Sequence, residues 1–333
     1  MNGRLENKIK IETHIQENIK DTPLYLQKFY HSLNSKSHTT KLRYINNIKR
    51  FLLKVYNGKY PSEDELNNID DYVIQIYMSE IEYYNTDGDI KELKENSKCI
   101  IYSSLAAFFR FLGKKDIIDN SPFSDGKIER PKINENQIVF LTPDEVRRVE
   151  AQIISGVGNS RSVSRQNDWK YRDLLLFRIP VINGLRVTAL SEINVNDVDL
   201  ETRSINVIDK GNISKTVAFD VKTANYLKIW IKEREKLLNG IEQDALFISN
   251  RRTRITTRSI ERLIDKYTVC IEGKHITPHK LRNTCGTNTY QVKKDINLTS
   301  KILGHKTTAP TQRYVAVFDE DKVNAINEVA ALY

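Results

Sequence analysis

The chain has 333 residues, 39% of them hydrophobic, and a net charge of +9, so it carries enough apolar surface for folded cores and is not a disordered chain. No apolar run reaches the roughly 20 residues of a membrane span, and the first twelve residues lack the apolar stretch of a secretory signal. Three widely spaced cysteines exclude a disulfide framework and a cysteine-based zinc site. We therefore expect two or three domains in a reducing cytoplasm, with no membrane partner, metal or cofactor.

Helical periodicity dominates the first third of the chain. A short helix is predicted from Leu24, and a second follows the N-cap candidate Ser37, with apolar residues recurring every three or four positions. Ser62 and Glu65 have the spacing of a capping box that opens a third helix over residues 63–84, and a fourth over residues 97–112 ends at Gly113. These four helices predict one small domain over residues 21–120, preceded by an extension over residues 1–20.

Charge is unevenly distributed within this domain. Residues 36–59 contain seven basic side chains and no acidic one, whereas residues 61–90 contain nine acidic side chains and no basic one. Solvated helix faces of opposite sign produce the same pattern. The charge distribution therefore permits a phosphate-binding face on the second helix without requiring one.

A second domain is predicted over residues 141–318, after a linker at residues 121–140 that Pro122, Gly126 and Pro131 interrupt. Thr142-Pro143 opens its first helix, and residues 155–168 form a polar loop. Two β-like segments, 204–208 and 215–219, flank a plausible hairpin turn at residues 209–212. The other predicted helices span residues 169–181, 221–238, 257–267, 278–290, 298–303, 310–317 and 321–332. The fold class is therefore mainly α with a small β-sheet.

Six polar residues in this second domain form an ordered series, each near the end of a predicted element: Arg186, Lys210, His279, Arg282, His305 and Tyr314. Each is uninformative alone, because chance by itself gives roughly 0.4 H-x-x-R pairs in a chain of this composition. Chance does not explain the presence of all six in this order. His279 and Arg282 are three residues apart, so one helix face presents both, and Thr277-Pro278 starts that helix with a dipole that favours an anion.

This series resembles the tyrosine recombinase (phage integrase) family, which includes the Xer recombinases and the integrases of mobile elements. The resemblance to the catalytic domain spans residues 141–318, and the N-terminal helices resemble the family's four-helix, SAM-like core-binding domain. It implies that Arg186 and Arg282 grip a DNA phosphate and that Lys210 is the general acid. It further implies that His279 and His305 assist at the phosphate and that Tyr314 is the nucleophile.

The chemistry of the residues supports these roles independently. A tyrosine that attacks a phosphodiester stores the phosphoryl bond on the enzyme, although its hydroxyl, with a pKa of about 10, needs a proton acceptor or a cationic site. Two guanidinium groups match the phosphate oxygens and neutralise the charge of the transition state, as Mg²⁺ does elsewhere. Among 16 tyrosines, Tyr290 is the competitor, and Lys215 on the same hairpin competes with Lys210. We favour Tyr314 and Lys210.

One position departs from the family pattern. The family usually places an acidic residue three positions after the first arginine, and here that position is Ala189. Glu192, one turn further on, is a candidate substitute for bracing the site. The departure affects the predicted contact that supports the first arginine and does not affect the assignment of the nucleophile.

Two basic clusters are candidates for DNA contact, one in each domain: Lys41, Arg43, Lys49 and Arg50, and then Arg251, Arg252, Arg254 and Arg258. A solvated, arginine-rich helix start is the alternative for the second cluster. Residues 319–333 form an amphipathic helix that either packs on its own domain or, as the family implies, is exchanged between protomers. The resemblance implies double-stranded DNA with an inverted-repeat core site, and a homo-oligomer, expected to be a tetramer on two such sites.

We predict a site-specific DNA recombinase, DNA-associated in a bacterial-type cytoplasm, that forms a 3′-phosphotyrosyl intermediate during integration, excision or dimer resolution. A type IB topoisomerase, which rejoins the same strand, and a catalytically inactive DNA-binding regulator are the alternatives. The compact first domain and the C-terminal helix favour the recombinase over the topoisomerase. The complete residue series argues against the inactive regulator.

Overall fold

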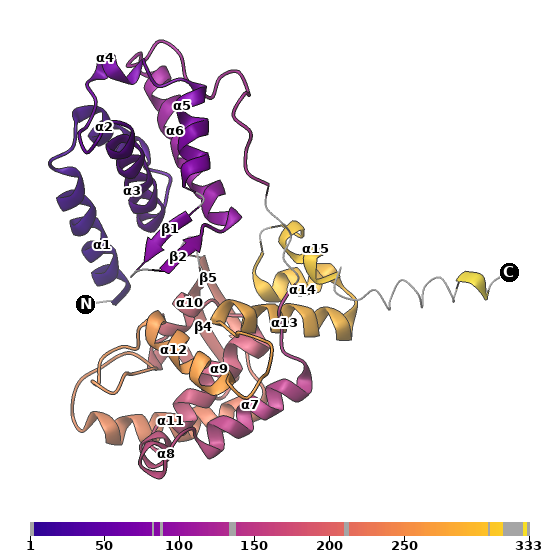
Figure 1. Ribbon diagram of the computed structural model, residues 1–333. Helices are drawn as coiled ribbons and strands as arrows, with labels where there is room; N and C mark the ends of the chain where they lie inside the picture. Colours follow the sequence, from indigo (N-terminus) through magenta and orange to yellow (C-terminus); the bar gives the residue numbers. More distant parts are fainter. Residues whose placement is uncertain are drawn as a thin grey trace. The chain divides into compact units, whose positions relative to one another are not determined.

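The computed structural model describes residues 3–81, 83–86, 89–132, 138–209, 213–305, 307–315 and 329–331. The chain divides into two compact units, Met1–Asn136 and Gln137–Tyr333, which we call the N-terminal and C-terminal units. Each has its own hydrophobic core, and helices predominate in both (Figure 1), as the predicted fold class requires. No helix within the described ranges is both long enough and apolar enough to cross a membrane.

In its described residues, the N-terminal unit has six helices around an aromatic-rich core and one β-hairpin. Its elements are α1 Gly3–Ile19, α2 Leu24–Ser32, α3 His38–Val55, α4 Glu63–Leu66, α5 Asp71–Glu80, β1 Tyr83–Thr86, β2 Asp89–Glu92 and α6 Glu95–Lys114. The side chain of Ser37 accepts a hydrogen bond from the amide of Thr40, and Ser62 and Glu65 form the predicted capping box. Phe51 of α3 stacks edge-on against Phe109 of α6, which fixes these two helices against each other.

Three local predictions for this unit are wrong. No helix was predicted before Leu24, yet α1 is present and buries Ile15 and Ile19 in the core. The single helix expected over residues 63–84 is broken, because Asp70 caps a new helix by accepting a hydrogen bond from the amide of Val73. No strand was predicted in this unit, yet Tyr83–Thr86 and Asp89–Glu92 pair as the antiparallel strands β1 and β2.

The C-terminal unit combines helices with a three-stranded antiparallel sheet in the order β3-β4-β5. Its first elements are α7 Pro143–Ser155, α8 Ser160–Asn167, α9 Lys170–Asn183, α10 Val187–Glu192, β3 Val198–Asp199, β4 Ser204–Asp209 and β5 Ile213–Ala218. The remaining elements are α11 Val221–Leu238, α12 Thr257–Thr268, α13 Pro278–Lys293, α14 Ile296–Leu303 and α15 Ala309–Val315. A helix, α8, replaces the polar loop expected over residues 155–168, because Asn159 caps it.

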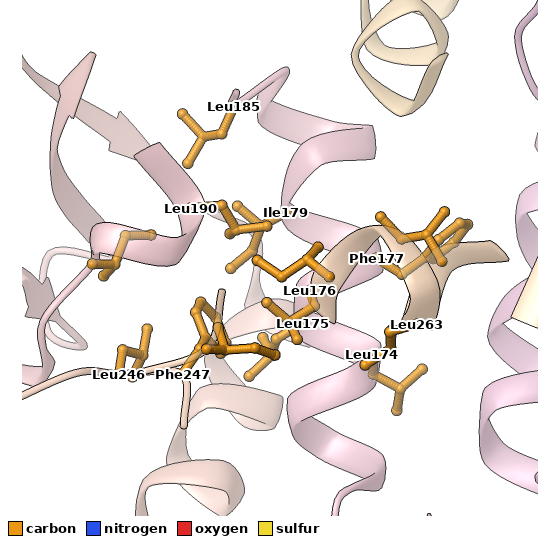
Figure 2. Close-up of a cluster of buried hydrophobic side chains, with 14 of the residues drawn as sticks. Leu174, Leu175, Leu176, Phe177, Ile179, Leu185, Leu190, Leu246, Phe247 and Leu263 are labelled. Atoms are coloured by element: carbon orange, nitrogen blue, oxygen red, sulfur yellow. The ribbon is translucent and has the colours of Figure 1, made fainter. Parts of the chain in front are cut away.

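The core of the C-terminal unit is built around α9. Its consecutive residues Leu174–Phe177 are all buried, so the helix is covered on every side (Figure 2). Leu246 and Phe247 pack against it, and Trp230 of α11 donates its indole hydrogen to the Leu246 carbonyl at 2.9 Å. Helix α9 ends at Gly184, whose left-handed backbone (φ +60°) turns the chain directly into Arg186 and α10. The core therefore fixes the position of the first arginine of the series.

Candidate active site

A cavity of about 230 Å³ lies where the turn from α9 to α10 meets the start of α13. The ionisable side chains that line it are Arg186, His279 and Arg282, three members of the predicted series. Arg186 and Tyr314 both lie near enough to Arg282 to shift the pKa of its guanidinium. The structure therefore gathers residues from positions 186 to 314 into one electrostatic neighbourhood.

Arg186 is the N-cap residue of α10, and a carboxylate holds its side chain. Its Nη1 donates to both carboxylate oxygens of Asp209, at 2.6 Å each. Asp209 ends β4 and is only 5% exposed, whereas the Arg186 side chain is 31% exposed. The buried carboxylate therefore anchors a guanidinium that still reaches solvent.

Arg282 is held by backbone carbonyls instead. Its Nη1 donates to the Gly184 carbonyl at 2.5 Å and its Nη2 to the Leu303 carbonyl at 2.6 Å. The side chain is 3% exposed, and burial lowers the pKa of its guanidinium, with the neighbouring charge of Arg186 acting in the same direction. Two turns, after α9 and after α14, thus fix this arginine in the wall of the cavity.

Both histidines are biased towards the neutral form. Loss of hydration, reinforced by the nearby guanidinium groups, lowers the pKa of His279. The same causes lower the pKa of His305 to about 4. The Nδ1 atom of His305 lies 2.8 Å from the hydroxyl oxygen of the buried Thr311, so the threonine three residues before Tyr314 orients this ring. At neutral pH each neutral imidazole can donate one hydrogen bond and accept another.

Tyr314 lies on α15 and is completely buried in the structure. Its hydroxyl donates to the Asn283 side-chain oxygen at 3.2 Å and accepts from Arg313 at 3.1 Å. Arg313 also donates to Asn283 at 2.8 Å, and its guanidinium lies 3.5 Å from a ring nitrogen of His279. The predicted nucleophile is therefore hydrogen-bonded to groups that border the two histidines and Arg282. The competitor Tyr290 packs, half-buried, at the edge of the small cluster around Tyr314.

Close approach between α13, α14 and α15 depends on glycine. A Cβ at Gly286 on α13 would lie 2.7 Å from the Tyr314 ring, and one at Gly184 would lie 2.6 Å from Leu303. Neither position has room for a methyl group. These glycines let the tyrosine ring and the Leu303 turn pack directly on backbone, and that packing brings α15 to the site.

Of the two hairpin lysines, Lys210 and Lys215, the structure describes only Lys215. Lys210 lies outside the described residues. Lys215 of β5 places its Nζ atom 3.6 Å from Asp209 and, among the described residues, this buried nitrogen has no hydrogen-bond partner. Burial lowers the pKa of Lys215, and Arg282 and Arg186 lower it further against the opposing charge of Asp209. A lysine with these surroundings gives up a proton more readily than a solvated one.

Three of the predicted DNA-contact residues are engaged inside the protein. The Nζ atom of Lys41 lies over the ring of Tyr30 at 5.1 Å, and Lys49 donates to the Asn18 carbonyl at 2.9 Å. Arg254 donates to main-chain carbonyls at the end of α10, including that of Ser191 at 3.0 Å. The other candidates have exposed side chains: Arg43, Arg50, Arg251, Arg252 and Arg258.

Sequence reasoning missed Asp209, Asn283 and Arg313 as members of this site. Asp209 directly precedes Lys210, and Asn283 and Arg313 directly adjoin Arg282 and Tyr314. Their positions beside predicted site residues were the available signal, but only the fold shows that their side chains hydrogen-bond Arg186 and Tyr314. Within the described part of the chain, no group of three or more histidine, cysteine or acidic residues gathers as a metal site would require.

Residues 140–321 match the family model of the phage integrase family. The chain is 29% identical to the tyrosine recombinase XerC of Caldanaerobacter subterraneus subsp. tengcongensis, over 68% of this chain and 60% of that protein. It is 28% identical to a tyrosine recombinase of Pseudothermotoga lettingae, over 88% of this chain and 92% of that protein. The match therefore spans less than two thirds of the first relative and nearly all of the second.

Solved structures with the same fold include two that contain DNA. The XerH site-specific recombinase bound to a palindromic difH substrate has a TM-score of 0.65 at 21% identity, over 90% of this chain and 83% of that one. The Tn1549 transposon integrase in complex with transposon right end DNA has a TM-score of 0.69 at 19% identity, over 92% of this chain and 98% of that one. At these identities the likeness establishes the fold.

Proposed function

We propose that this chain, which belongs to the phage integrase family, is a tyrosine recombinase that breaks and rejoins DNA strands, and that Tyr314 is its nucleophile. The observation that supports this assignment is the hydroxyl of Tyr314, which is hydrogen-bonded beside a cavity lined by Arg186, His279 and Arg282. No other tyrosine has the spacing after Gly304-His305 that the family motif requires.

In the proposed reaction the Tyr314 oxygen attacks the scissile phosphorus. A new P–O bond forms to tyrosine, the bond from phosphorus to the 5′-oxygen breaks, and a 3′-phosphotyrosyl link remains. The phenolic proton passes to a neutral histidine of the site, and the departing 5′-oxygen takes a proton from the general-acid lysine to become a hydroxyl. The same hydroxyl, from a partner duplex, reverses the step, so the strands are rejoined without a high-energy cofactor.

Arg186 and Arg282 are the proposed clamp for the phosphate. Arg282 uses two of its nitrogens on backbone carbonyls and Arg186 uses one on Asp209, which leaves N–H groups on both for phosphate oxygens. His279 and His305, neutral at pH 7, are proposed to hydrogen-bond the phosphate oxygens and to shuttle protons. Removal of one such charge-stabilising donor commonly lowers the rate about 10²–10³-fold.

Lys210 remains the proposed general acid for the 5′-oxygen. Lys215 is the alternative, because its buried ammonium lies beside Asp209. The two are separable, because a single-turnover assay with a 5′-bridging phosphorothiolate substrate provides a leaving group that needs no proton. The true general acid is the lysine whose replacement is rescued by that substrate.

For DNA binding we propose the exposed arginines of each unit. Arg43 of α3 lines an open hollow of about 410 Å³ with the hydroxyl groups of Ser37, Thr40 and Ser103, a lining that suits a phosphate. Arg50 is exposed further along α3. Lys41, Lys49 and Arg254, which the sequence also offered, have internal partners in the structure and are not part of this proposal.

The substrate and assembly are further proposals. We infer a duplex with an inverted-repeat core site and a tetramer on two such sites, acting in a bacterial-type cytoplasm. The XerH complex contains a palindromic substrate, which fits a two-fold arrangement of protomers. The exchanged helix proposed for residues 319–333 falls almost wholly outside the described residues. The relatives are recombinases and do not favour the topoisomerase or the inactive regulator.

The test is a covalent trap on a duplex selected by binding from a random-sequence library. Wild-type protein should form an adduct that survives detergent, Tyr314→Phe should bind the duplex and form none, and Tyr290→Phe should react like wild type. An adduct of normal yield with Tyr314→Phe would overturn the nucleophile. Joints between two duplexes, absent with a topoisomerase, identify strand exchange.

A further inference from the structure

The position at which the family usually carries an acidic residue is occupied by a buried alanine in this chain. Ala189 lies on α10 and is 3% exposed, so its methyl group is packed and provides no charge. Glu192 was the sequence-based substitute, but the carboxylate hydrogen-bonded to Arg186 belongs to Asp209. The acid beside the first arginine therefore comes from a different element, the end of strand β4.

Asp209 serves two cations at once. One of its oxygens, Oδ2, accepts from Arg186 at 2.6 Å and lies 3.6 Å from the Lys215 ammonium. Without this carboxylate, the positive charges of Arg186 and Lys215 would lie close to each other and to Arg282 with no negative charge from Asp209 to balance them. A charged side chain so well buried is stable only when it is paired.

The contact is made in a way that leaves Arg186 able to bind a ligand. Of the Arg186 nitrogens, Nη1 is the one that donates to Asp209, and within the described part of the chain Nε and Nη2 of Arg186 carry no hydrogen bond. Those nitrogens belong to a residue that lines the cavity shared with Arg282 and His279. A carboxylate that plugged the site would instead occupy the face of the guanidinium that a phosphate needs.

We propose that Asp209 is a positioning residue that orients Arg186 for the scissile phosphate, in place of the acid that is missing at position 189, and that its charge also balances the neighbouring Lys215 ammonium. The proposal rests on the proposed function, because it requires Arg186 to bind that phosphate. It assigns the charge of Asp209, rather than its volume, as the feature that matters.

Asp209→Asn tests this by removing the charge and keeping the shape. Single-turnover adduct formation should slow about 10- to 100-fold, as misplacement of a catalytic group commonly does. DNA affinity should be unchanged or higher, because a negative charge near the phosphate has gone. Slower chemistry with equal or tighter binding is a split that general structural damage would not produce.

Two further variants make the result interpretable. Asp220→Asn breaks another arginine–carboxylate pair of the same unit, with Arg178, and should leave both adduct rate and affinity near wild type. Asp209→Glu keeps the charge on a longer arm and should react faster than Asp209→Asn, which also serves if the asparagine variant proves unstable.

The proposal is overturned if Asp209→Asn reacts as fast as wild type, or faster, while Arg186→Ala loses activity. A rate above wild type in Asp209→Asn would identify Asp209 as a plug that competes with phosphate, and an equal rate would show that its charge has no role in positioning Arg186. If Arg186→Ala itself reacts normally, the failure lies in the proposed phosphate clamp and not in Asp209.

Discussion

The two arginines of the site perform the same proposed task but are held in place differently. Arg282 is buried and donates to two main-chain carbonyls, so its position depends on backbone turns at Gly184 and Leu303. Arg186 is half-buried and held by the charge of Asp209. The difference teaches that one half of the site should respond to changes in packing and the other to changes in charge.

The largest effect is expected for the backbone-held arginine. Lysine at position 282 keeps the charge but cannot donate to both carbonyls through a planar fork. Arg282→Lys should therefore lower the single-turnover adduct rate about 10²–10³-fold. A loss of less than about tenfold would show that charge alone suffices at this position, and would remove the contrast with Arg186.

The turn that supports Arg282 can be changed without touching its side chain. Gly184→Ala adds a Cβ 2.6 Å from Leu303 at a residue with φ +60°, so both overlap and backbone strain oppose it. The free energy of unfolding should fall by about 1–3 kcal/mol, measured by denaturant titration. Gly240→Ala has a similar backbone strain with no atom within 4 Å, and it therefore separates strain from overlap. Equal losses in the two variants would rule out crowding at Leu303.

Arg313 tests whether the nucleophile is oriented by charge or by packing. Arg313→Met removes the donor to the Tyr314 hydroxyl and to Asn283 while keeping a long side chain. The adduct rate should fall about tenfold, the value of one charge-assisted hydrogen bond. The neighbouring exposed Gln312 provides the control Gln312→Met. An unchanged rate in Arg313→Met would show that burial alone positions Tyr314.

The pH dependence of stability probes the neutral histidine. The pKa of His305 is about 4 in the folded protein, below its ordinary value of 6.5. Between these values the unfolded chain takes up a proton that the folded chain does not, so the stabilisation is complete above pH 6.5 and is lost as the pH falls towards 4. The drop in melting temperature from pH 7 to pH 5 should be smaller in His305→Gln than in wild type and in His31→Gln. An identical drop in all three would contradict the burial of a neutral imidazole.

The smallest effects distinguish engaged from available basic residues on α3. Arg50→Ala should reduce the slope of log affinity against log salt by about 1, as expected for one lost phosphate contact. Lys49→Ala should leave that slope unchanged and lower the melting temperature, because Lys49 is bonded to the Asn18 carbonyl. The reverse pattern would assign the DNA-facing side of α3 to Lys49.

The sequence predicted most helices of the C-terminal unit because caps and apolar periodicity are local signals. The hairpin of β4 and β5, the capping box at Ser62 and the helix start at Thr142 are confirmed. Helix α1 escaped notice because its apolar residues are sparse among charged ones, and only tertiary burial of Ile15 and Ile19 reveals it.

The site also has one part that the sequence predicts and one part that only the tertiary structure shows. The order and spacing of the series from Arg186 to Tyr314 are readable in one dimension, and they are sufficient to indicate the chemistry. The contact of Asp209 with Arg186 depends on strand register beside α10, and that of Arg313 with Asn283 depends on how α15 packs on α13. No local pattern encodes these tertiary contacts.

The most direct test of the account is the identity of the residue that becomes linked to DNA. The trapped adduct, digested with nuclease and protease, can be mapped by mass spectrometry to a single modified side chain. The account predicts a nucleotide attached to the oxygen of Tyr314. A nucleotide on Tyr290, or on any residue remote from Arg186 and Arg282, would contradict it.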